Sequence, residues 1–101
     1  MHEDKTRLTE DQLTAALGQL EGWRRSGVLL VKDFQFATYR EINRFLPYLG
    51  KTIAAQNHHP DFSFDSSRKL VHVEVTTHSE GDLTQADVNL AQALDVWREQ
   101  A

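Results

Sequence analysis

The side chains best suited to catalysis in this 101-residue chain are histidines. Two of them stand in the sequence Asn57-His58-His59-Pro60, and a third, His78, follows a strand-like segment. An imidazole has an unperturbed pKa of about 6.5, so it can give or take a proton near neutral pH. Such groups suit a metal-free acid–base reaction, for example a dehydration in which one group removes a proton while another protonates the departing hydroxyl.

Three histidines could also hold zinc, with water as the fourth ligand. However, the adjacent His58 and His59 point in different directions on an extended backbone, no histidine pair has i, i+4 spacing on a helix, and the chain has no cysteine. We therefore expect no metal site. Any one of these histidines could simply be a turn or cap residue, but three of them at two neighbouring corners favour a site. His2, in a charged terminal segment, and His72, on a strand, are not expected to act.

The composition limits the range of functions. Lys and Arg total 11 against 15 Asp and Glu, a net charge of −4, so the chain lacks the basic surface that nucleic acid or anionic lipid would require. It has no apolar run long enough to span a membrane and no apolar leader, so we expect a cytoplasmic protein. The length predicts a single domain over residues 1–101, with residues 1–7 as a loose end.

Three helices are predicted from threonine caps, each three residues before a side chain that can reach back to the cap. The helices are expected over residues 10–20, from 39 to about 56, and from 85 to about 99. Pro47 lies inside the second and predicts a kink or a restart there. The capping explains Asp87 as a structural residue. The capping pairs are Thr9 with Gln12, Thr38 with Glu41, and Thr84 with Asp87.

Four strand-like segments lie between these helices. Residues 21–26 and 28–36 predict a hairpin. Phe62 and Phe64 alternate with polar residues, which predicts a third strand with its aromatic side turned inward. In residues 70–78 valines alternate with polar side chains, as in a strand with one covered face.

The element order α-β-β-α-β-β-α predicts an α+β domain, a two-layer sandwich in which three helices cover one face of a four-stranded antiparallel sheet. If the last two strands pair as a hairpin, the start of one lies beside the end of the other. The corner at His58 and His59 would then lie at the same end of the sheet as His78.

Three longer segments carry a resemblance to a known family: NHHPDF, VHVEVTTHSEGDLTQADVNLAQALD and the upstream GWRRSGVLLVKDFQFATYREINRF. Together they resemble the pterin-4a-carbinolamine dehydratase family over nearly the whole chain. The resemblance implies removal of water from 4a-hydroxytetrahydrobiopterin to give quinonoid dihydrobiopterin, without metal or cofactor. This reaction recycles the pterin cofactor of aromatic amino acid hydroxylases. The resemblance also implies a homodimer or homotetramer.

The resemblance implies specific roles for the corner residues. His58, His59 and His78 would form the acid–base set, and the segments around Pro60 and from Thr77 to Glu80 would border the pterin. The family usually has a Glu four residues before the first His of the corner, where this chain has Ala54. The family's hairpin is also about two residues shorter than the one in this chain, whose tip is formed by residues 65–69. The expected substrate-binding residues are Pro60, Asp61, Thr77, Ser79 and Glu80.

The same resemblance leaves other functions open. Animal members of the family also serve as dimerisation cofactors of a homeodomain transcription factor, so a non-catalytic pterin-binding or dimerisation role is an alternative. A role in molybdopterin metabolism is a third possibility, since a related pterin is the ligand there. A measurement of 4a-carbinolamine decay with and without the protein separates catalysis from binding.

Overall fold

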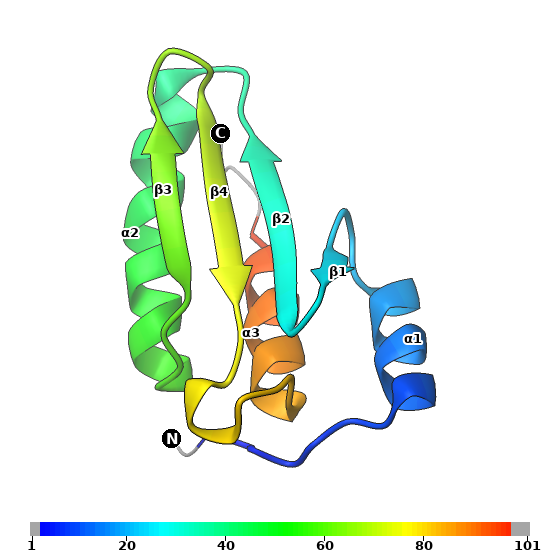
Figure 1. Ribbon diagram of the computed structural model, residues 1–101. Coiled ribbons are helices and arrows are strands. Elements are labelled where there is room, and N and C mark those ends of the chain that lie inside the picture. The colour runs from blue at the N-terminus through cyan, green and yellow to red at the C-terminus, as the bar shows by residue number, and fades with distance from the viewer. Residues whose placement is uncertain (1–2, 98–101) are drawn as a thin grey trace.

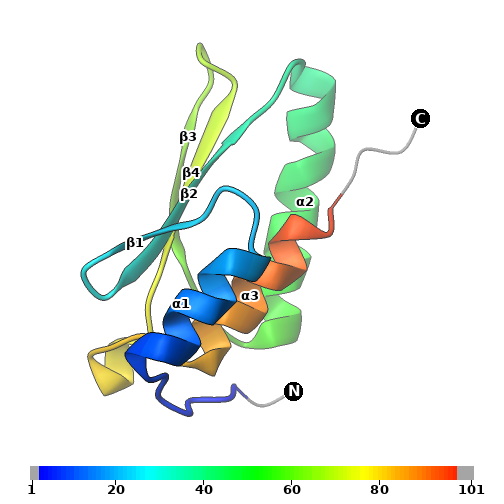
Figure 2. The ribbon, with the colours of Figure 1, turned by 90° about the vertical axis from the view of Figure 1, so that its right-hand side faces the viewer.

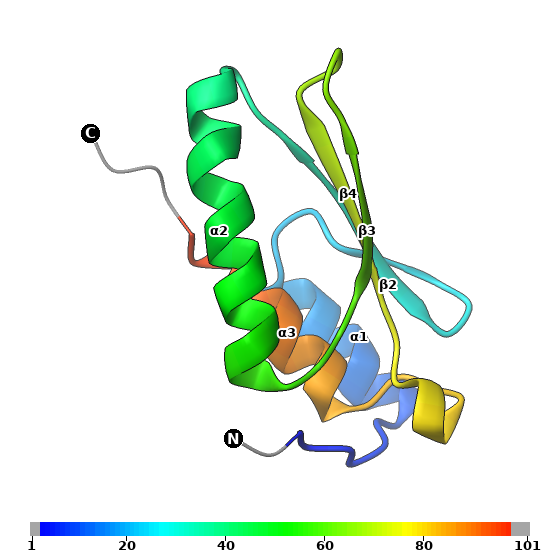
Figure 3. The same cartoon turned by 90° about the vertical axis from the view of Figure 1, so that its left-hand side faces the viewer.

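The computed structural model describes residues 3–97, in which three helices cover one face of a four-stranded antiparallel sheet (Figure 1). The two turned views show the helices on one side of the sheet and its other face uncovered (Figures 2 and 3). The predicted α+β fold is confirmed. The elements are α1 (Glu10–Gln19), β1 (Arg24–Ser26), β2 (Leu29–Gln35), α2 (Tyr39–Gln56), β3 (Asp61–Asp65), β4 (Leu70–Val75), the 3₁₀ helix η1 (His78–Glu80) and α3 (Gln85–Asp95).

The strand order β1-β2-β4-β3 places the two ends of the expected site together. All neighbouring strands are antiparallel, and Asp61 at the start of β3 pairs with Glu74 near the end of β4. The segment before β3 and the segment after β4 therefore leave the sheet at the same end, as predicted for a hairpin of the last two strands. Within residues 3–97 none of the helices has the length and hydropathy that a bilayer crossing needs.

Each helix begins at the predicted threonine. Thr9 Oγ1 accepts a hydrogen bond from the Gln12 N–H at 3.1 Å, and Gln12 Oε1 accepts one from the Thr9 N–H at 2.9 Å. Thr38 Oγ1 accepts from the Glu41 N–H at 3.2 Å. α3 also begins with a reciprocal capping box, at Thr84. These caps satisfy N–H groups that have no partner inside their own helix.

Two helices differ from the prediction. α2 continues through Pro47 as one helix, which excludes a restart, one of the two predicted outcomes, and the proline is exposed, so water can reach the backbone carbonyl that loses its partner. α3 ends at Asp95, earlier than the predicted end near Glu99, which itself lies outside the described residues. Beyond Asp95 the chain turns so that Trp97 packs edge-on against Phe45, with ring centroids 5.3 Å apart. The first strand is also shorter than the predicted 21–26.

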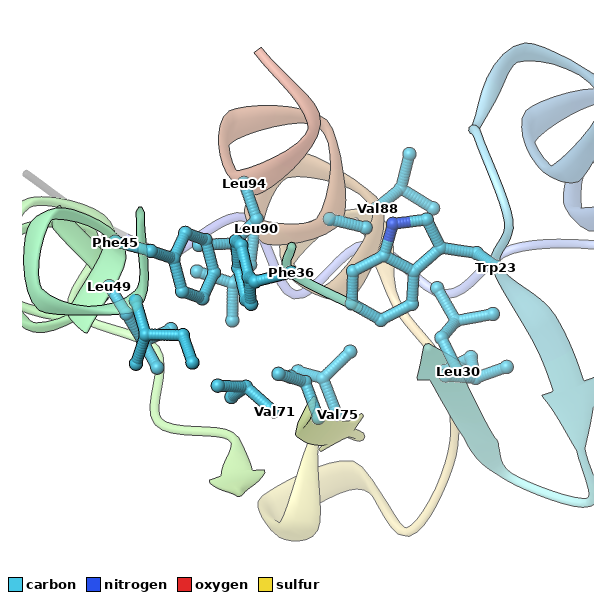
Figure 4. Close-up of a cluster of buried hydrophobic side chains, with 14 of the residues drawn as sticks. Trp23, Leu30, Phe36, Phe45, Leu49, Val71, Val75, Val88, Leu90 and Leu94 are labelled. Carbon is cyan, nitrogen blue, oxygen red and sulfur yellow. The ribbon is translucent and has the colours of Figure 1, made fainter. Parts of the chain in front are cut away.

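The core lies between the sheet and the helices (Figure 4). The valines of β4 point toward the helices and are fully buried, as the alternation predicted. Phe45 of α2 is fully buried among aromatic rings, with Phe34 and Phe36 of the β2 segment at centroid distances of 4.9 and 5.1 Å. Burying such side chains supplies most of the driving force for folding.

Asp95 ties the end of α3 to the first half of the sheet. Its Oδ1 accepts hydrogen bonds from Lys32 Nζ and from Trp23 Nε1, each at 2.8 Å. Its Oδ2 accepts one from the Glu21 N–H at 2.9 Å. The pairing explains how Lys32 lies on the helix-covered side of β2, since its charge is compensated by a carboxylate that is itself 10% exposed.

The aromatic side chains of β3 are not buried as predicted. Phe62 and Phe64 pair with Val73 and Val71, so they share the helix-covered face, but they are 49% and 43% exposed. β3 is an edge strand, so its side chains have a neighbouring strand on one side only. The alternation in the sequence predicts which face of the sheet the two aromatic side chains share, but it does not predict that their strand lies at the edge.

The N-terminal segment is attached to α3 rather than loose. The Thr6 carbonyl accepts a hydrogen bond from the Gln85 N–H at 2.9 Å, Arg7 forms a bridge with Thr84, and Arg7 Nη2 donates to the Glu80 carbonyl at 2.9 Å. These contacts correct the expectation of a loose end for residues 6 and 7. His2, also assigned to that end, lies outside the described residues.

Candidate active site

The end of α2, η1 and the N-terminal segment come together at one end of the sheet (Figure 1). Residues of these three segments line a pocket of about 200 Å³. This is smaller than the roughly 300–1,000 Å³ of pockets that enclose drug-sized ligands, so a ligand here is small or stays partly exposed. The residues that line it come from three places: Glu3 and Lys5; His58 and His59; and Thr76, Thr77, His78 and Ser79.

The corner that carries two histidines is built by the end of α2. Asn57 has a left-handed conformation (φ 51°, ψ 41°), which asparagine tolerates better than most residues, and its N–H bonds to the Ala54 carbonyl. This turn directs the chain away from the helix axis. Pro60 follows and favours extended backbone at His59. As a result His58 is buried, 5% exposed, whereas its neighbour His59 is exposed.

His58 is held by a carboxylate from the opposite side of the site. Its Nε2 donates to Oδ1 of Asp87 at 2.6 Å, and Asp87 is fully buried. Oδ2 of Asp87 accepts from Thr77 Oγ1 and from the Thr84 N–H, each at 2.8 Å. Asp87 therefore does two things at once, since it closes the cap of α3 and orients the ring of His58.

The environment of His58 favours its protonated form. The hydrogen bond and charge of Asp87 raise its pKa above the ordinary value, against the opposing effect of burial, and Glu3 adds to the increase. The carboxylate oxygen of Glu3 lies 3.4 Å from Nδ1 of His58. With Nε2 bound to Asp87, Nδ1 is the ring nitrogen that remains on the side of the pocket.

The third histidine comes from the other corner. β4 ends at Val75, Thr77 pairs with Asp82 in a bridge, and His78 begins η1, so its imidazole lies at the pocket and not at the end of a continuous strand as predicted. Both His59 and His78 are exposed. The pocket thus combines one buried imidazole with two that water and ligand can reach.

The structure brings five of the eight expected site residues to the pocket: His58, His59, His78, Thr77 and Ser79. Pro60 is buried and does not line it. Asp61 lines a different hollow, on the uncovered face of the sheet beside Ser63 and His72. Glu80 turns toward Arg7, with Oε1 3.8 Å from Arg7 Nε.

Four residues at the site are not predicted as functional from the sequence. Glu3 and Lys5 line the pocket because the N-terminal segment is attached to α3, a contact between distant parts of the chain that no local pattern reveals. Thr76 lines it with a buried hydroxyl that has no hydrogen-bond partner among the described residues. The sequence explains Asp87 as a cap alone, although an aspartate in a capping box can accept several hydrogen bonds.

His72 lies away from the pocket, as expected. Its Nδ1 bonds to Asp33 and its Nε2 donates to Glu74 at 2.9 Å, all on the uncovered face of the sheet. The hydrogen bonds that it donates to Glu74 and Asp33 raise its pKa. Across the described residues, 3–97, no group of three or more His, Asp or Glu side chains has an arrangement that could hold a metal ion.

Comparisons with known proteins agree on one family. The family model described as pterin 4 alpha carbinolamine dehydratase matches residues 6–97. A protein of Metallosphaera sedula, provisionally named pterin-4-alpha-carbinolamine dehydratase, is 39% identical over 89 residues, 88% of this chain and 91% of that protein. One of Koribacter versatilis with the same provisional name is 32% identical over 88 residues, 87% and 92% of the two chains.

A solved structure is similar over the same range. The crystal structure of a protein named transcriptional coactivator/pterin dehydratase, from Brucella melitensis, has a TM-score of 0.80 at 26% identity, and the match covers 88% of this chain and 95% of the other.

Proposed function

The chain belongs to the pterin 4 alpha carbinolamine dehydratase family, and on that basis we propose that it removes water from 4a-hydroxytetrahydrobiopterin to give quinonoid dihydrobiopterin. The observation that best supports this reaction is the convergence of His58, His59 and His78 on one pocket. The reaction would take place in the cytoplasm, as a step in recycling a pterin cofactor.

The dehydration needs two proton transfers. The bond from C4a to the hydroxyl oxygen breaks, the oxygen leaves as water after receiving a proton, and the adjacent ring nitrogen loses its proton as its lone pair forms the new C=N bond. Atoms and charge balance without an oxidant or a metal. An enzyme can accelerate this sequence by placing one acid and one base at the two positions.

His58 is the proposed acid. Asp87 holds its Nε2, and this hydrogen bond raises the pKa of His58 and so favours the imidazolium form, which would give up its proton from Nδ1. This arrangement resembles other catalytic imidazoles, in which a buried carboxylate fixes the orientation of the ring and stabilises its charge.

The exposed imidazoles are the proposed base. His59 and His78 approach the pocket from two different corners, so each can contact a different edge of a flat bicyclic ligand. The hydroxyl of Thr77 is already committed to Asp87, which makes its side chain part of the support for His58. The exposed hydroxyl of Ser79 donates a 3.5 Å hydrogen bond to Glu80 Oε2, and its oxygen can still accept one from the ligand.

The decisive experiment generates the 4a-carbinolamine in solution and follows its decay by ultraviolet absorbance, with and without the protein. Accelerated decay that survives exhaustive chelation would support metal-free catalysis. Acceleration lost on chelation and restored by zinc would contradict it. Saturable binding of a pterin with no acceleration would instead favour the non-catalytic alternative.

We also propose that the chain assembles with copies of itself. β3 is an edge strand whose outer side has no strand partner among the described residues, and its Phe62 and Phe64 are about half exposed. An unprotected edge with exposed aromatic residues favours pairing with another strand. A protein-binding role is the second candidate function, since the similar Brucella melitensis protein is named a coactivator as well as a dehydratase.

A further inference from the structure

Glu3 is the single carboxylate among the described residues that line the pocket. Its side chain is 20% exposed, and Oε2 lies 3.4 Å from Nδ1 of His58. The nearby Lys5 ammonium is 3.8 Å from the same oxygen, and Lys5 is more exposed, at 45%. His58 is therefore placed between two carboxylates, Asp87 at one ring nitrogen and Glu3 at the other.

The position of Glu3 is set by the rest of its segment. Asp4 Oδ1 accepts hydrogen bonds from both the N–H and the Oγ1 of Thr6, at 3.0 and 2.6 Å, which forms a tight turn immediately after Glu3. Thr6 and Arg7 are in turn bonded to the start of α3 and to η1. Asp87 belongs to α3, and the segment that carries Glu3 is bonded to the start of α3. Both carboxylates near His58 are therefore held in place by the same helix.

The end of α2 does not supply a carboxylate of its own. Ala54, one helical turn before His58, has a methyl side chain and is exposed. The carboxylate that lies 3.4 Å from Nδ1 comes instead from Glu3 of the N-terminal segment.

We propose that Glu3 is a positioning residue of the active site, which acts through Nδ1 of His58 to keep that imidazole oriented and protonated for the dehydration. The proposal rests on the dehydratase function proposed above. It assigns a role to a segment that the sequence pattern presents as an unstructured end. Glu3 adds a second negative charge beside an imidazolium that Asp87 already stabilises.

The pH dependence gives the proposal a specific signature. The charged or titratable groups that face His58 are Asp87 from α3, Glu3 and Lys5 from the N-terminal segment, and the pocket imidazoles His59 and His78. Removing the charge of Glu3 leaves the other groups in place and weakens the preference for imidazolium. Loss of activity should then be smallest below the ordinary imidazole pKa of about 6.5 and should grow as the pH rises toward 8.

The test compares Glu3→Gln, Glu3→Asp and the control Glu10→Gln, using a pH–rate profile for the dehydration and an NMR titration of the His58 ring. Glu10 is a matched control because it also loses one ion pair, with Arg25, at an exposed position in the first turn of α1. We expect Glu3→Gln to lower kcat/KM about threefold at pH 8, the effect of a partly exposed charge pair. The alkaline limb of the profile and the His58 titration should both move to lower pH.

Glu3→Asp, which keeps the charge, should restore part of the loss, and Glu10→Gln should match the wild type. The proposal is overturned if Glu3→Gln leaves both the alkaline limb and the His58 titration where the wild type has them. It is also overturned if activity falls equally at every pH, as expected of a purely structural contact. If the wild type shows no dehydratase activity, the proposed function fails, and the titration still decides whether Glu3 and His58 are coupled.

Discussion

His58 and Asp87 are joined by a 2.6 Å hydrogen bond from Nε2 to Oδ1, and the second oxygen of the same buried carboxylate closes the cap of α3. The two residues are 29 positions apart in sequence. Their contact links the corner after α2 to the first turn of the last helix. The orientation of His58 and the start of α3 thus depend on one side chain.

Asp87→Asn should reduce both stability and activity. Asp87 accepts hydrogen bonds from three donors, whereas asparagine has a single acceptor oxygen and a donor NH₂ group, so at least one buried donor loses its partner. We expect the free energy of unfolding in urea to fall by about 1–3 kcal/mol. The pKa of His58 should fall as well, and with it the dehydration rate at neutral pH.

Thr9→Ala is the matched control for that change, because it breaks the equivalent capping box of α1, and neither Thr9 nor α1 lines the pocket. It should cost about 1 kcal/mol of stability and leave the rate unchanged. If Asp87→Asn behaved in the same way, with the His58 titration intact, Asp87 would be a cap and nothing more.

Stability should decrease as the pH rises above neutrality. The pKa of His58 is raised in the folded state, so the folded protein binds more protons than the unfolded chain once the pH exceeds the ordinary value of about 6.5. The stabilisation is complete below that value and is lost as the pH rises through the folded-state pKa. His72, with its pKa also raised, contributes in the same direction but is more exposed.

Urea unfolding at intervals from about pH 5.5 to about pH 9, on either side of the ordinary imidazole pKa, measures this effect. His72→Gln should remove part of the slope and leave the rest to His58. A free energy of unfolding that stayed constant or increased over that interval would contradict the raised pKa of His58.

His59→Ala and His78→Ala should each lower the dehydration rate by about a hundredfold to ten-thousandfold, the usual effect of removing a positioned acid or base. An appreciable uncatalysed dehydration would compress the measured loss. Both side chains are exposed, so stability should change by no more than about 0.5 kcal/mol. His72→Ala, on the other face of the sheet, should leave the rate unchanged, and equal losses for all three variants would point to a different site.

Pro47→Ala should stabilise the protein. Pro47 lies inside an unbroken helix and lacks the N–H that would bond to the carbonyl four residues earlier, and its ring is exposed, so little packing is lost with it. We expect the free energy of unfolding to rise by about 1–3 kcal/mol, with the dehydration rate unchanged. A decrease would show that the ring makes a contact of its own, for example with another subunit.

Sedimentation should show a mass at least twice the 11.6 kDa of one chain at micromolar concentration. Phe62→Glu, on the edge strand β3, should shift the protein toward the single-chain mass by placing a charge on the proposed contact. Val28→Glu is a control, because Val28 is similarly exposed at 45% but lies at the turn between β1 and β2. A single-chain mass for the unmodified protein would exclude the proposed assembly.

Features set by short-range chemistry could be predicted from the sequence. The three threonine caps depend on residues three positions apart, and the burial of the β4 valines depends on alternation along one strand. To predict that the two corners with histidines lie at the same end of the sheet, one further assumption was needed, namely that β3 pairs with β4.

Features set by distant contacts could not be predicted. The exposure of Phe62 depends on β3 being an edge strand, and the attachment of Thr6 depends on where α3 begins in space. The second role of Asp87 could not be predicted for another reason. The capping motif explains this aspartate from its neighbours in sequence, and the motif does not show that His58 lies within hydrogen-bond distance.

Asp95 has a consequence for how the chain acquires its structure during translation. Trp23 and Lys32 leave the ribosome long before Asp95, the acceptor of their hydrogen bonds, has been synthesised. The Gln85 N–H that bonds to Thr6 and the Asp87 carboxylate that orients His58 also arrive late. A nascent chain that ends before α3 therefore lacks the carboxylates that hold Trp23, Lys32 and His58. Folding should occur in one step after α3 emerges, and arrested shorter chains should be substrates for chaperones and proteases.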